Sequence, residues 1–179
     1  MYIVAWIVGL AVLISAALAG LSAAPWLPTL PKQRRHLFEH LKLTPGQKVV
    51  DLGCGDGSML FAVARLHPEV ICIGYDISLL PLCIAWVRKF ASFRAYRNVH
   101  IYFGDLFKQD LHAYDVIFVF LLSKCYPKLV TVLRNSASPN AQIIVEAWPL
   151  PNIEPTNTIK AEKLLPMYVY SGQDLRANA

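Results

Sequence analysis

The sequence has little cysteine, and its thiols follow no metal-binding spacing. The four cysteines are scattered along the chain: Cys54, Cys72, Cys83 and Cys125. They form no CxxC pair and no regular pattern with the histidines, so neither a zinc site nor a disulfide framework is indicated and reduced thiols are expected. His36 and His40 share one face of a predicted helix, but nothing supplies further ligands. We therefore predict a surface pair and no metal site.

Charge is absent from the N-terminal segment. No charged residue precedes Lys32, and the apolar run Tyr2 to Ala24 is long enough to cross a bilayer as a helix at about 1.5 Å per residue. A cleaved signal peptide is the alternative, yet no basic stretch precedes the run and the run is longer than a usual signal core. We predict a single transmembrane anchor. Arg34 and Arg35 follow it, so the positive-inside tendency places the remaining chain on the cytoplasmic side, or on the equivalent side of an organelle.

The third glycine of a dinucleotide-binding turn is also lacking. The segment VVDLGCGDGS (Val49 to Ser58) has the spacing GxGxG, with Ser58 at the position where GxGxxG has its last glycine. Asp51, two residues before the first glycine, would repel a pyrophosphate but suits a ligand that carries an ammonium and a sulfonium. The turn therefore predicts a site for S-adenosylmethionine (SAM), and an ordinary tight strand-to-helix turn is the alternative.

Apolar runs separated mostly by helical patterns predict the fold class. After the first strand they are Val70 to Tyr75, Val99 to Phe103, Val116 to Phe120 and Ala141 to Ala147, and Thr158 to Ser171 has room for a closing pair of strands. This order predicts an α/β fold with a doubly wound, mainly parallel sheet and helices on both faces. In such sheets, ligands bind beyond the carboxyl ends of the strands.

Three carboxylates are predicted at those strand ends, namely Asp51, Asp76 and Asp105. Asp76 ends the second strand, where a carboxylate can accept hydrogen bonds from ribose hydroxyls. Each acidic residue also has a structural interpretation. Asp76 can cap the helix that follows, Asp105 can be a turn residue, Asp56 can cap the helix near Gly57, and Asp115 more simply opens a strand.

The motifs DLGCGDG (51–57), GYD (74–76) and GDLF (104–107), in this order, resemble the class I, seven-strand SAM-dependent methyltransferases. The resemblance covers about residues 25–170. Within that superfamily the chain is most similar to the small protein-lysine methyltransferases, which include an archaeal enzyme of broad specificity and membrane-anchored mitochondrial enzymes acting on the adenine nucleotide translocase and the ATP synthase c-subunit.

Three local segments carry this closer resemblance. They are PWLPT (Pro25 to Thr29), LCIAWVRKFASFRAYR (Leu82 to Arg97) and FLLSKCYPKL (Phe120 to Leu129). The segment EAWPLP (Glu146 to Pro151) departs from the family pattern. An Asn-Pro-Pro-Tyr motif is lacking after the fourth strand, which disfavours methylation of base or glutamine amides.

The resemblance implies a role for each part of the site. Asp51 and the glycine turn would hold the methionine part of SAM, Asp76 the ribose, and Asp105 with Leu106 the adenine. Thr29 would lie over the methionine end and Trp148 would line the substrate channel, whereas no catalytic base is assigned. The predicted cofactor-binding residues are Thr29, Asp51, Gly53, Cys54, Gly55, Asp56, Gly57, Asp76, Ile77, Asp105 and Leu106.

These observations predict four segments: an anchor (1–24), a linker with an N-terminal helix (25–47), a methyltransferase domain (48–171) and a C-terminal tail (172–179). The predicted function is methyl transfer from SAM to lysine side chains of a membrane-associated protein. Two alternatives stay open. The acceptor can instead be a membrane lipid, a quinone precursor or another small molecule, or the chain can be a membrane-bound SAM-binding module without catalysis.

The formal net charge of +5 raises the question of nucleic acid. Basic residues cluster in one segment among aromatic residues: Trp86, Arg88, Lys89, Phe90, Phe93, Arg94, Tyr96 and Arg97. The spacing of the aromatic residues predicts one stripe of a helix that packs on the sheet. Beside an anchor, the basic residues suit anionic lipid headgroups, so no nucleic-acid partner is predicted.

Overall fold

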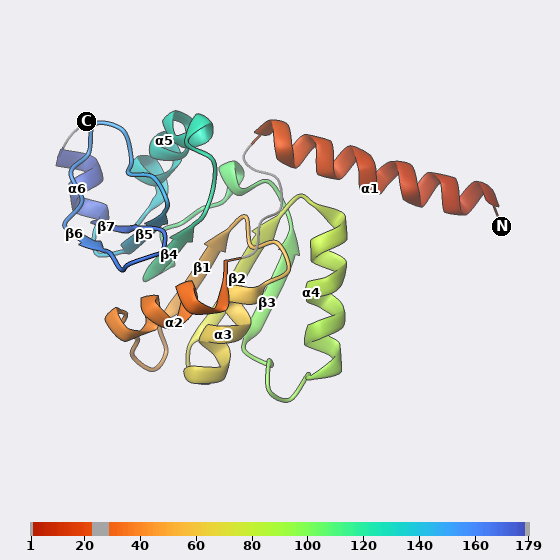
Figure 1. Cartoon of the computed structure of the whole chain (residues 1–179), viewed down its shortest axis with the longest axis horizontal. Helices are drawn as coiled ribbons and strands as arrows, with labels where there is room; N and C mark the ends of the chain where they lie inside the picture. Colours follow the sequence, from red (N-terminus) through yellow and green to blue (C-terminus); the bar gives the residue numbers. More distant parts are fainter. Residues whose placement is uncertain (1, 23–28, 178–179) are drawn as a thin grey trace.

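A seven-stranded sheet lies between two layers of helices (Figure 1). This computed structural model describes residues 2–22 and 29–177. The strands are β1 (Lys48–Leu52), β2 (Ile71–Asp76), β3 (Val99–Phe103), β4 (Val116–Val119), β5 (Gln142–Glu146), β6 (Asn157–Ile159) and β7 (Met167–Ser171). The helices are α1 (Tyr2–Ser22), α2 (Pro31–His40), α3 (Ser58–Leu66), α4 (Leu79–Ala91), α5 (Tyr126–Ser136) and α6 (Gly172–Ala177). Two 3₁₀ turns, η1 (Leu106–Lys108) and η2 (Ser123–Cys125), follow β3 and β4.

The strand order is β3-β2-β1-β4-β5-β7-β6, and the first five strands are parallel. Strand β7 runs antiparallel to both β5 and β6. The predicted α/β doubly wound sheet is confirmed, and a closing pair of strands is present near the predicted position. The strand order reverses between β1 and β4, so the crevice for a ligand is expected above the carboxyl end of β1.

Alternating side chains of the strands fill two separate cores, one on each face of the sheet. Val50 of β1 packs with α5, η1 and α6, whereas its neighbour Val49 packs with α2, α3 and α4. The same division separates Ile143 from Ile144 in β5. Because successive side chains of a strand point to opposite faces, the near-continuous apolar runs of the sequence are what a sheet covered on both sides requires.

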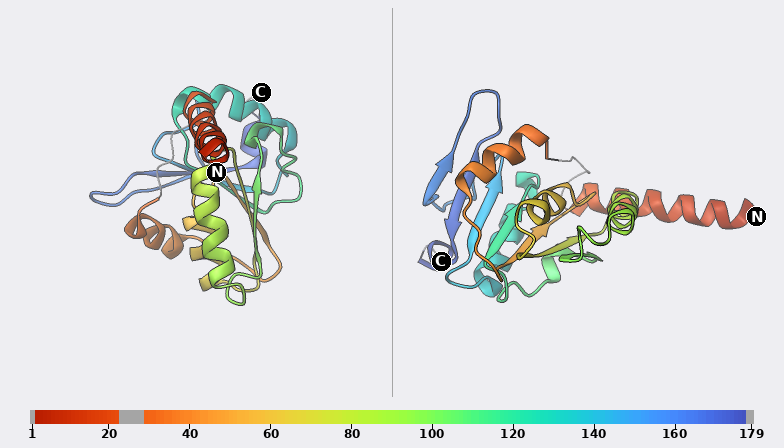
Figure 2. Two further views of the ribbon diagram at one scale, coloured as in Figure 1. Left: turned by 90° about the vertical axis from the view of Figure 1, so that its right-hand side faces the viewer. Right: turned by 90° about the horizontal axis from the view of Figure 1, so that it is seen from below.

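Helix α1 extends away from the body of the domain and meets the N-terminal end of α4 (Figures 1 and 2). The Leu79 amide of α4 donates a hydrogen bond to the Ser15 hydroxyl of α1, at 3.1 Å. Within residues 2–22 and 29–177, no helix qualifies as long and apolar enough to span a membrane. The structure thus does not support the predicted transmembrane anchor.

The predicted aromatic stripe of the segment 82–97 is wrong in its second half. Helix α4 ends at Ala91, because Ser92 leaves the helical conformation and donates its amide to the Lys89 carbonyl at 3.3 Å. As a result only part of the stripe packs on the domain. Trp86 and Tyr96 contact the core, whereas Phe90 and Phe93 are 74% and 60% exposed.

The C-terminal segment has more structure than a tail. Residues 172–177 form α6, and Leu175 of this helix is fully buried against the core that includes α5. The Arg134 side chain of α5 donates a hydrogen bond to the Leu175 carbonyl at 2.8 Å. This helix therefore closes one end of the domain.

Candidate active site

The glycine-rich turn lies at the carboxyl end of β1 and is fixed by backbone hydrogen bonds. The Gly53 and Cys54 amides both donate to the Tyr75 carbonyl of β2, at 2.9 and 3.1 Å. Gly57 has φ +71°, and a Cβ there would lie 2.8 Å from the Phe61 ring. Gly53 has φ +87°, and its Cβ would meet Leu121 at 2.9 Å. Both glycines are therefore required by backbone conformation and by close approach.

Asp76, at the end of β2, ties the turn to the start of α4. One carboxylate oxygen accepts the Gly55 amide at 2.8 Å, and the other accepts the Ser78 amide at 2.7 Å. The N-cap residue of α4 is Ser78, and it makes no side-chain capping bond, so the capping role that the sequence left open for Asp76 is not found; Asp76 instead holds the turn before the helix. Because a carboxylate oxygen has more than one acceptor site, these bonds leave capacity for ribose hydroxyls.

Asp51 and Glu146 line one small cavity of about 20 Å³, which also touches residues at the carboxyl ends of β1, β4 and β5. Thr29 and aliphatic and aromatic side chains form the rest of its lining. Asp51 and Glu146 are 8% and 5% exposed. When they are ionised, two buried carboxylates in one cavity favour a cationic ligand.

Burial changes the protonation of both carboxyl groups. The pKa of Asp51 is raised to about 8 by burial first, and then by the charges of Asp76, Glu146 and Asp56. Burial likewise raises the pKa of Glu146 to about 7, although a hydrogen bond from Thr29 and the charge of Arg34 lower it. The Thr29 hydroxyl donates to Glu146 Oε2 at 3.3 Å. Near neutral pH, each group can therefore hold or release a proton when a cation binds.

Asp56 contacts the starts of two segments, the turn that leads into α3 and the Arg88 side chain of α4. Its Oδ1 accepts the Ser58 amide at 3.1 Å, and its Oδ2 accepts a hydrogen bond from the Arg88 guanidinium at 3.1 Å. Arg88 also donates to the Asp56 carbonyl at 3.2 Å. Asp56 thus holds α4 against the turn, but it is not the predicted cap of α3, because the N-cap residue is Gly57 and no side-chain capping bond is made. Nothing in the sequence spacing pairs these two residues.

The loop after β3 completes one side of the crevice. Asp105 accepts the Phe107 amide at 2.9 Å and so caps η1, as the turn interpretation predicts. Leu106 is buried, and one of its methyl groups would lie 3.9 Å from a Cβ at Gly53. A methyl group of Leu121 approaches the same Cβ position. The loops after β1, β3 and β4 therefore meet at Gly53. The sequence motifs do not single out Leu121.

The remaining predicted residues are more peripheral. Ile77 is half-buried between Asp76 and α4, and Cys54 is buried with its pKa raised by burial and then by the Asp51 charge. Trp148 follows β5 and is 42% exposed. Glu146 is absent from the residues that the sequence predicts for the site. The signal available in the sequence is its position as the one charged residue at the end of the apolar run IIVE.

The arrangement fits SAM. The ammonium and sulfonium of this cofactor match the buried carboxylate of Asp51, and Asp76 stands at the neighbouring strand end. The close approach at Gly53 leaves no room for a side chain between the turn and Leu121.

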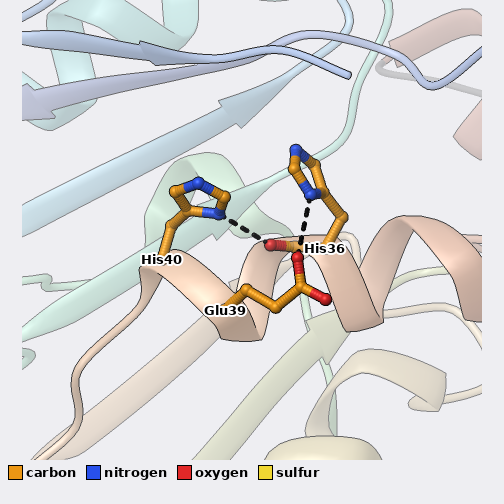
Figure 3. A group of neighbouring side chains, drawn as sticks. All are labelled: His36, Glu39 and His40. Atoms are coloured by element: carbon orange, nitrogen blue, oxygen red, sulfur yellow. Dashed lines mark hydrogen bonds and ion pairs between the residues drawn. The ribbon is translucent and has the colours of Figure 1, made fainter. Parts of the chain in front are cut away.

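One group of possible metal ligands occurs in the part of the chain that the structure describes: His36, Glu39 and His40 of α2 (Figure 3). The ligand atoms lie within 4.8 Å of one another. His36 Nδ1 lies 3.3 Å from Glu39 Oε2, and His40 Nδ1 lies 3.0 Å from the His36 carbonyl oxygen. These contacts occupy one nitrogen of each ring, and Glu39 and His40 are exposed. None of the three residues belongs to the glycine turn or to its carboxylates.

The sheet order and the turn at β1 define a class I methyltransferase fold, and solved structures agree. An RNA methyltransferase from Salinibacter ruber in complex with S-adenosyl-L-homocysteine has a TM-score of 0.74 at 23% identity, covering 81% of this chain and 93% of that one. The family described as the ANTKMT methyltransferase domain matches residues 51–157. This chain belongs to that methyltransferase family.

Two relatives with assigned activities are similar over most of this chain. The Xenopus laevis lysine N-methyltransferase of the ATP synthase c-subunit is 28% identical over 136 residues, 73% of this chain and 56% of the relative. A protein-lysine N-methyltransferase of Saccharolobus islandicus is 25% identical over 140 residues, 77% of this chain and 85% of the relative. The chain thus spans about half the length of the vertebrate relatives that it matches.

Proposed function

We propose that this protein is a SAM-dependent methyltransferase that acts on lysine side chains of a protein. The observation that carries the proposal is the pair of buried carboxylates, Asp51 and Glu146, in one cavity beside the glycine turn. One carboxylate suffices for the cofactor ammonium. The second one, at the end of β5, suits a second amine. The names of the relatives support lysine as the acceptor.

Asp51 is proposed to hold the methionine end of SAM, with Thr29 above it, and Asp76 is proposed to accept the ribose hydroxyls. SAM supplies a methyl group on a positively charged sulfur, so the acceptor nitrogen needs mainly in-line placement and exclusion of water. The glycine turn, with Asp56 as its brace, fixes the cofactor side of this alignment. Leu106 and Leu121, which both approach Gly53, are proposed to exclude water there.

Lysine must be neutral to attack. With a reference pKa near 10.4, neutralising its amine at pH 7 costs roughly 4 to 5 kcal/mol. Glu146 is proposed to receive the ammonium as an ion pair and to accept its proton, because the pKa of this carboxyl is already raised to about 7. The Thr29 hydroxyl donates to the same carboxylate and fixes its orientation. The transfer forms the N–CH₃ bond and breaks the S–CH₃ bond, and the proton leaves through Glu146.

The acceptor is further proposed to be associated with a membrane, with the domain on the side where SAM is made. The support is a surface of apolar side chains that α1 and α4 expose to solvent. They include Tyr2, Ile3, Trp6, Ile7, Leu10, Leu80, Val87 and Phe90. A concentration of exposed apolar side chains on two neighbouring helices is typical of an interaction site.

The test is to incubate the whole chain in detergent or nanodiscs with methyl-labelled SAM and membranes from its source, then separate protein, lipid and small molecules. We expect the label on lysine of one or a few membrane proteins. Asp76→Ala is the matched control, and at SAM concentrations below saturation it should incorporate much less label than the wild type. Label in lipid, or no label in any fraction at saturating SAM, would replace lysine methylation with one of the alternatives.

A second measurement, of the kinetics of a Glu146 variant, tests whether Glu146 receives the amine. Glu146→Gln should lower kcat at least about tenfold with little change in SAM affinity, because Asp51 still holds the cofactor. It should also remove the rise of kcat with pH that ionisation of a carboxyl with a pKa of about 7 gives. An unchanged pH profile would assign the proton to another group.

A further inference from the structure

A cleft of about 350 Å³ lies on one flank of the glycine turn, between α2, α3 and α4. It is open to solvent and distinct from the small cavity of Asp51, although Thr29 lines both. Three arginines from three different helices line it: Arg34, Arg65 and Arg88. Because these residues lie far apart in the sequence, only the packing of the helices places their guanidinium groups around one space.

Positive charge in the cleft is not balanced by the protein. Among the described lining residues, Asp56 is the only acidic one, and its carboxylate already accepts the Arg88 guanidinium at 3.1 Å. One carboxylate therefore faces three positive charges. The pKa of Arg34 is lowered by burial, and the charges of Arg88 and Arg65 act in the same direction against the attraction of Asp56. The arginines repel one another, and an anion would relieve that repulsion.

Two of the arginines are held in place. Arg34 is half-buried and donates a hydrogen bond to the Thr29 carbonyl. Arg88 is half-buried, lies 5.4 Å from the centre of the Phe61 ring and is fixed by Asp56. Ordinary surface arginines lose side-chain entropy when they bind an anion, whereas fixed guanidinium groups lose less. The cleft is therefore organised before any ligand arrives.

We propose that this cleft binds a phosphate group. Guanidinium groups donate parallel N–H bonds that match the oxygens of phosphate, and a dianion compensates two positive charges. The Ser58 and Tyr96 side chains of the lining add hydroxyl groups. Because the open cleft of about 350 Å³ exceeds the volume of a phosphate alone, it leaves room for an organic group beside the phosphate, near Phe61 and Tyr96, whose rings lie 4.6 Å apart.

The proposal does not depend on the identity of the methyl acceptor. The cleft lies beside the glycine turn, and Arg88 of the cleft holds Asp56 of the turn, so a ligand in the cleft can affect the cofactor site. A phosphate that shares Arg88 with Asp56 would contact the same segment that forms the cofactor turn. The ligand can come from a free phosphorylated molecule or from a phospholipid headgroup, since the recognised chemistry is the same.

The first test titrates inorganic phosphate and then pyrophosphate into the whole chain saturated with S-adenosyl-L-homocysteine, by calorimetry at constant ionic strength. We expect saturable binding that Arg65→Gln weakens about five- to tenfold, because one charge-assisted contact is lost. Arg65 is exposed, so this variant should fold normally. Arg94→Gln is the matched control, since Arg94 is an exposed arginine outside the cleft lining, and it should bind as the wild type does.

Equal affinities of the Arg65→Gln and Arg94→Gln variants would overturn the proposal, as would absence of saturable binding. Competition by S-adenosyl-L-homocysteine would also overturn it, because the anion would then occupy the cofactor site. Sedimentation with vesicles of phosphatidylcholine, with and without phosphatidic acid, distinguishes the sources. Binding to phosphatidic acid that pyrophosphate displaces and that Arg65→Gln weakens identifies a headgroup, whereas calorimetric binding without vesicle binding identifies a free phosphate.

Discussion

Replacing Glu146 by glutamine should stabilise the cofactor-free protein, and more so at alkaline pH. The glutamine side chain has nearly the same shape, and its amide oxygen can still accept the Thr29 hydroxyl that Glu146 accepts at 3.3 Å. What the substitution removes is a carboxylate that is 5% exposed and shares a cavity with Asp51. A buried charge of this kind destabilises the folded state when no cation is bound.

The magnitude follows from the pKa of Glu146, which burial raises from 4.5 to about 7. A carboxyl whose pKa is higher in the folded than in the unfolded state lowers the stability progressively as pH rises through that window. Above pH 7 the full penalty applies, and it amounts to about 3 kcal/mol because one pKa unit corresponds to about 1.4 kcal/mol. At pH 5 the penalty is about 1 kcal/mol, because this pH lies only slightly above 4.5, where the carboxyl group ionises in the unfolded chain.

The assay is urea unfolding of the wild type and of Glu146→Gln at about pH 5 and about pH 8.5, without cofactor. The gain in unfolding free energy should be larger by about 2 kcal/mol at the higher pH. Glu162→Gln serves as the control because its side chain is 90% exposed and should show no such difference. A gain that is the same at both pH values would refute the reasoning, because the carboxyl would then titrate normally.

Three further changes probe the turn and its carboxylates. Asp51, whose pKa is raised to about 8, must lose its proton to pair with the cofactor ammonium. In the wild type, calorimetry should therefore find that SAM affinity rises between about pH 6 and 8, by up to about tenfold per pH unit. Asp51→Asn should abolish this rise. Asp76→Ala should weaken SAM binding about 10- to 100-fold while circular dichroism stays unchanged, and normal affinity would remove the ribose assignment. Gly57→Ala should lower the unfolding free energy by about 1–3 kcal/mol, because φ is +71° and the new Cβ would lie 2.8 Å from the Phe61 ring; an unchanged urea midpoint would show that the turn can relax.

The sequence is informative wherever one local pattern decides the structure. The run Val49 to Leu52 followed by GxGxG predicts both a buried strand and a turn, and β1 and the turn are found there. The closing strands are predictable from the length of chain that follows β5. Alternating burial on two sheet faces follows because the runs are apolar nearly throughout.

Contacts between distant segments are not predictable in this way. Glu146 becomes notable only because the sheet brings β5 within reach of Thr29 and β1, and Arg88 only because α4 packs beside the turn. The aromatic stripe predicts a helix that continues to Tyr96, yet α4 ends at Ala91, where no proline or glycine marks the end. For α1, hydrophobicity alone predicts a membrane span, and the structure does not support that prediction.

The hydrogen bond between Ser15 and Leu79 links the farthest helix to the cofactor side of the domain. Leu79 is the first residue of α4 and stands shortly after Asp76, whose carboxylate already holds the Gly55 and Ser78 amides. A shortened chain without α1 would leave the Leu79 amide without this acceptor and free the start of α4 to shift. In such a fragment the glycine turn would lack one of its supports, so the measured cofactor affinity would differ from that of the whole chain. Biochemical work on this enzyme should therefore retain the N-terminal helix.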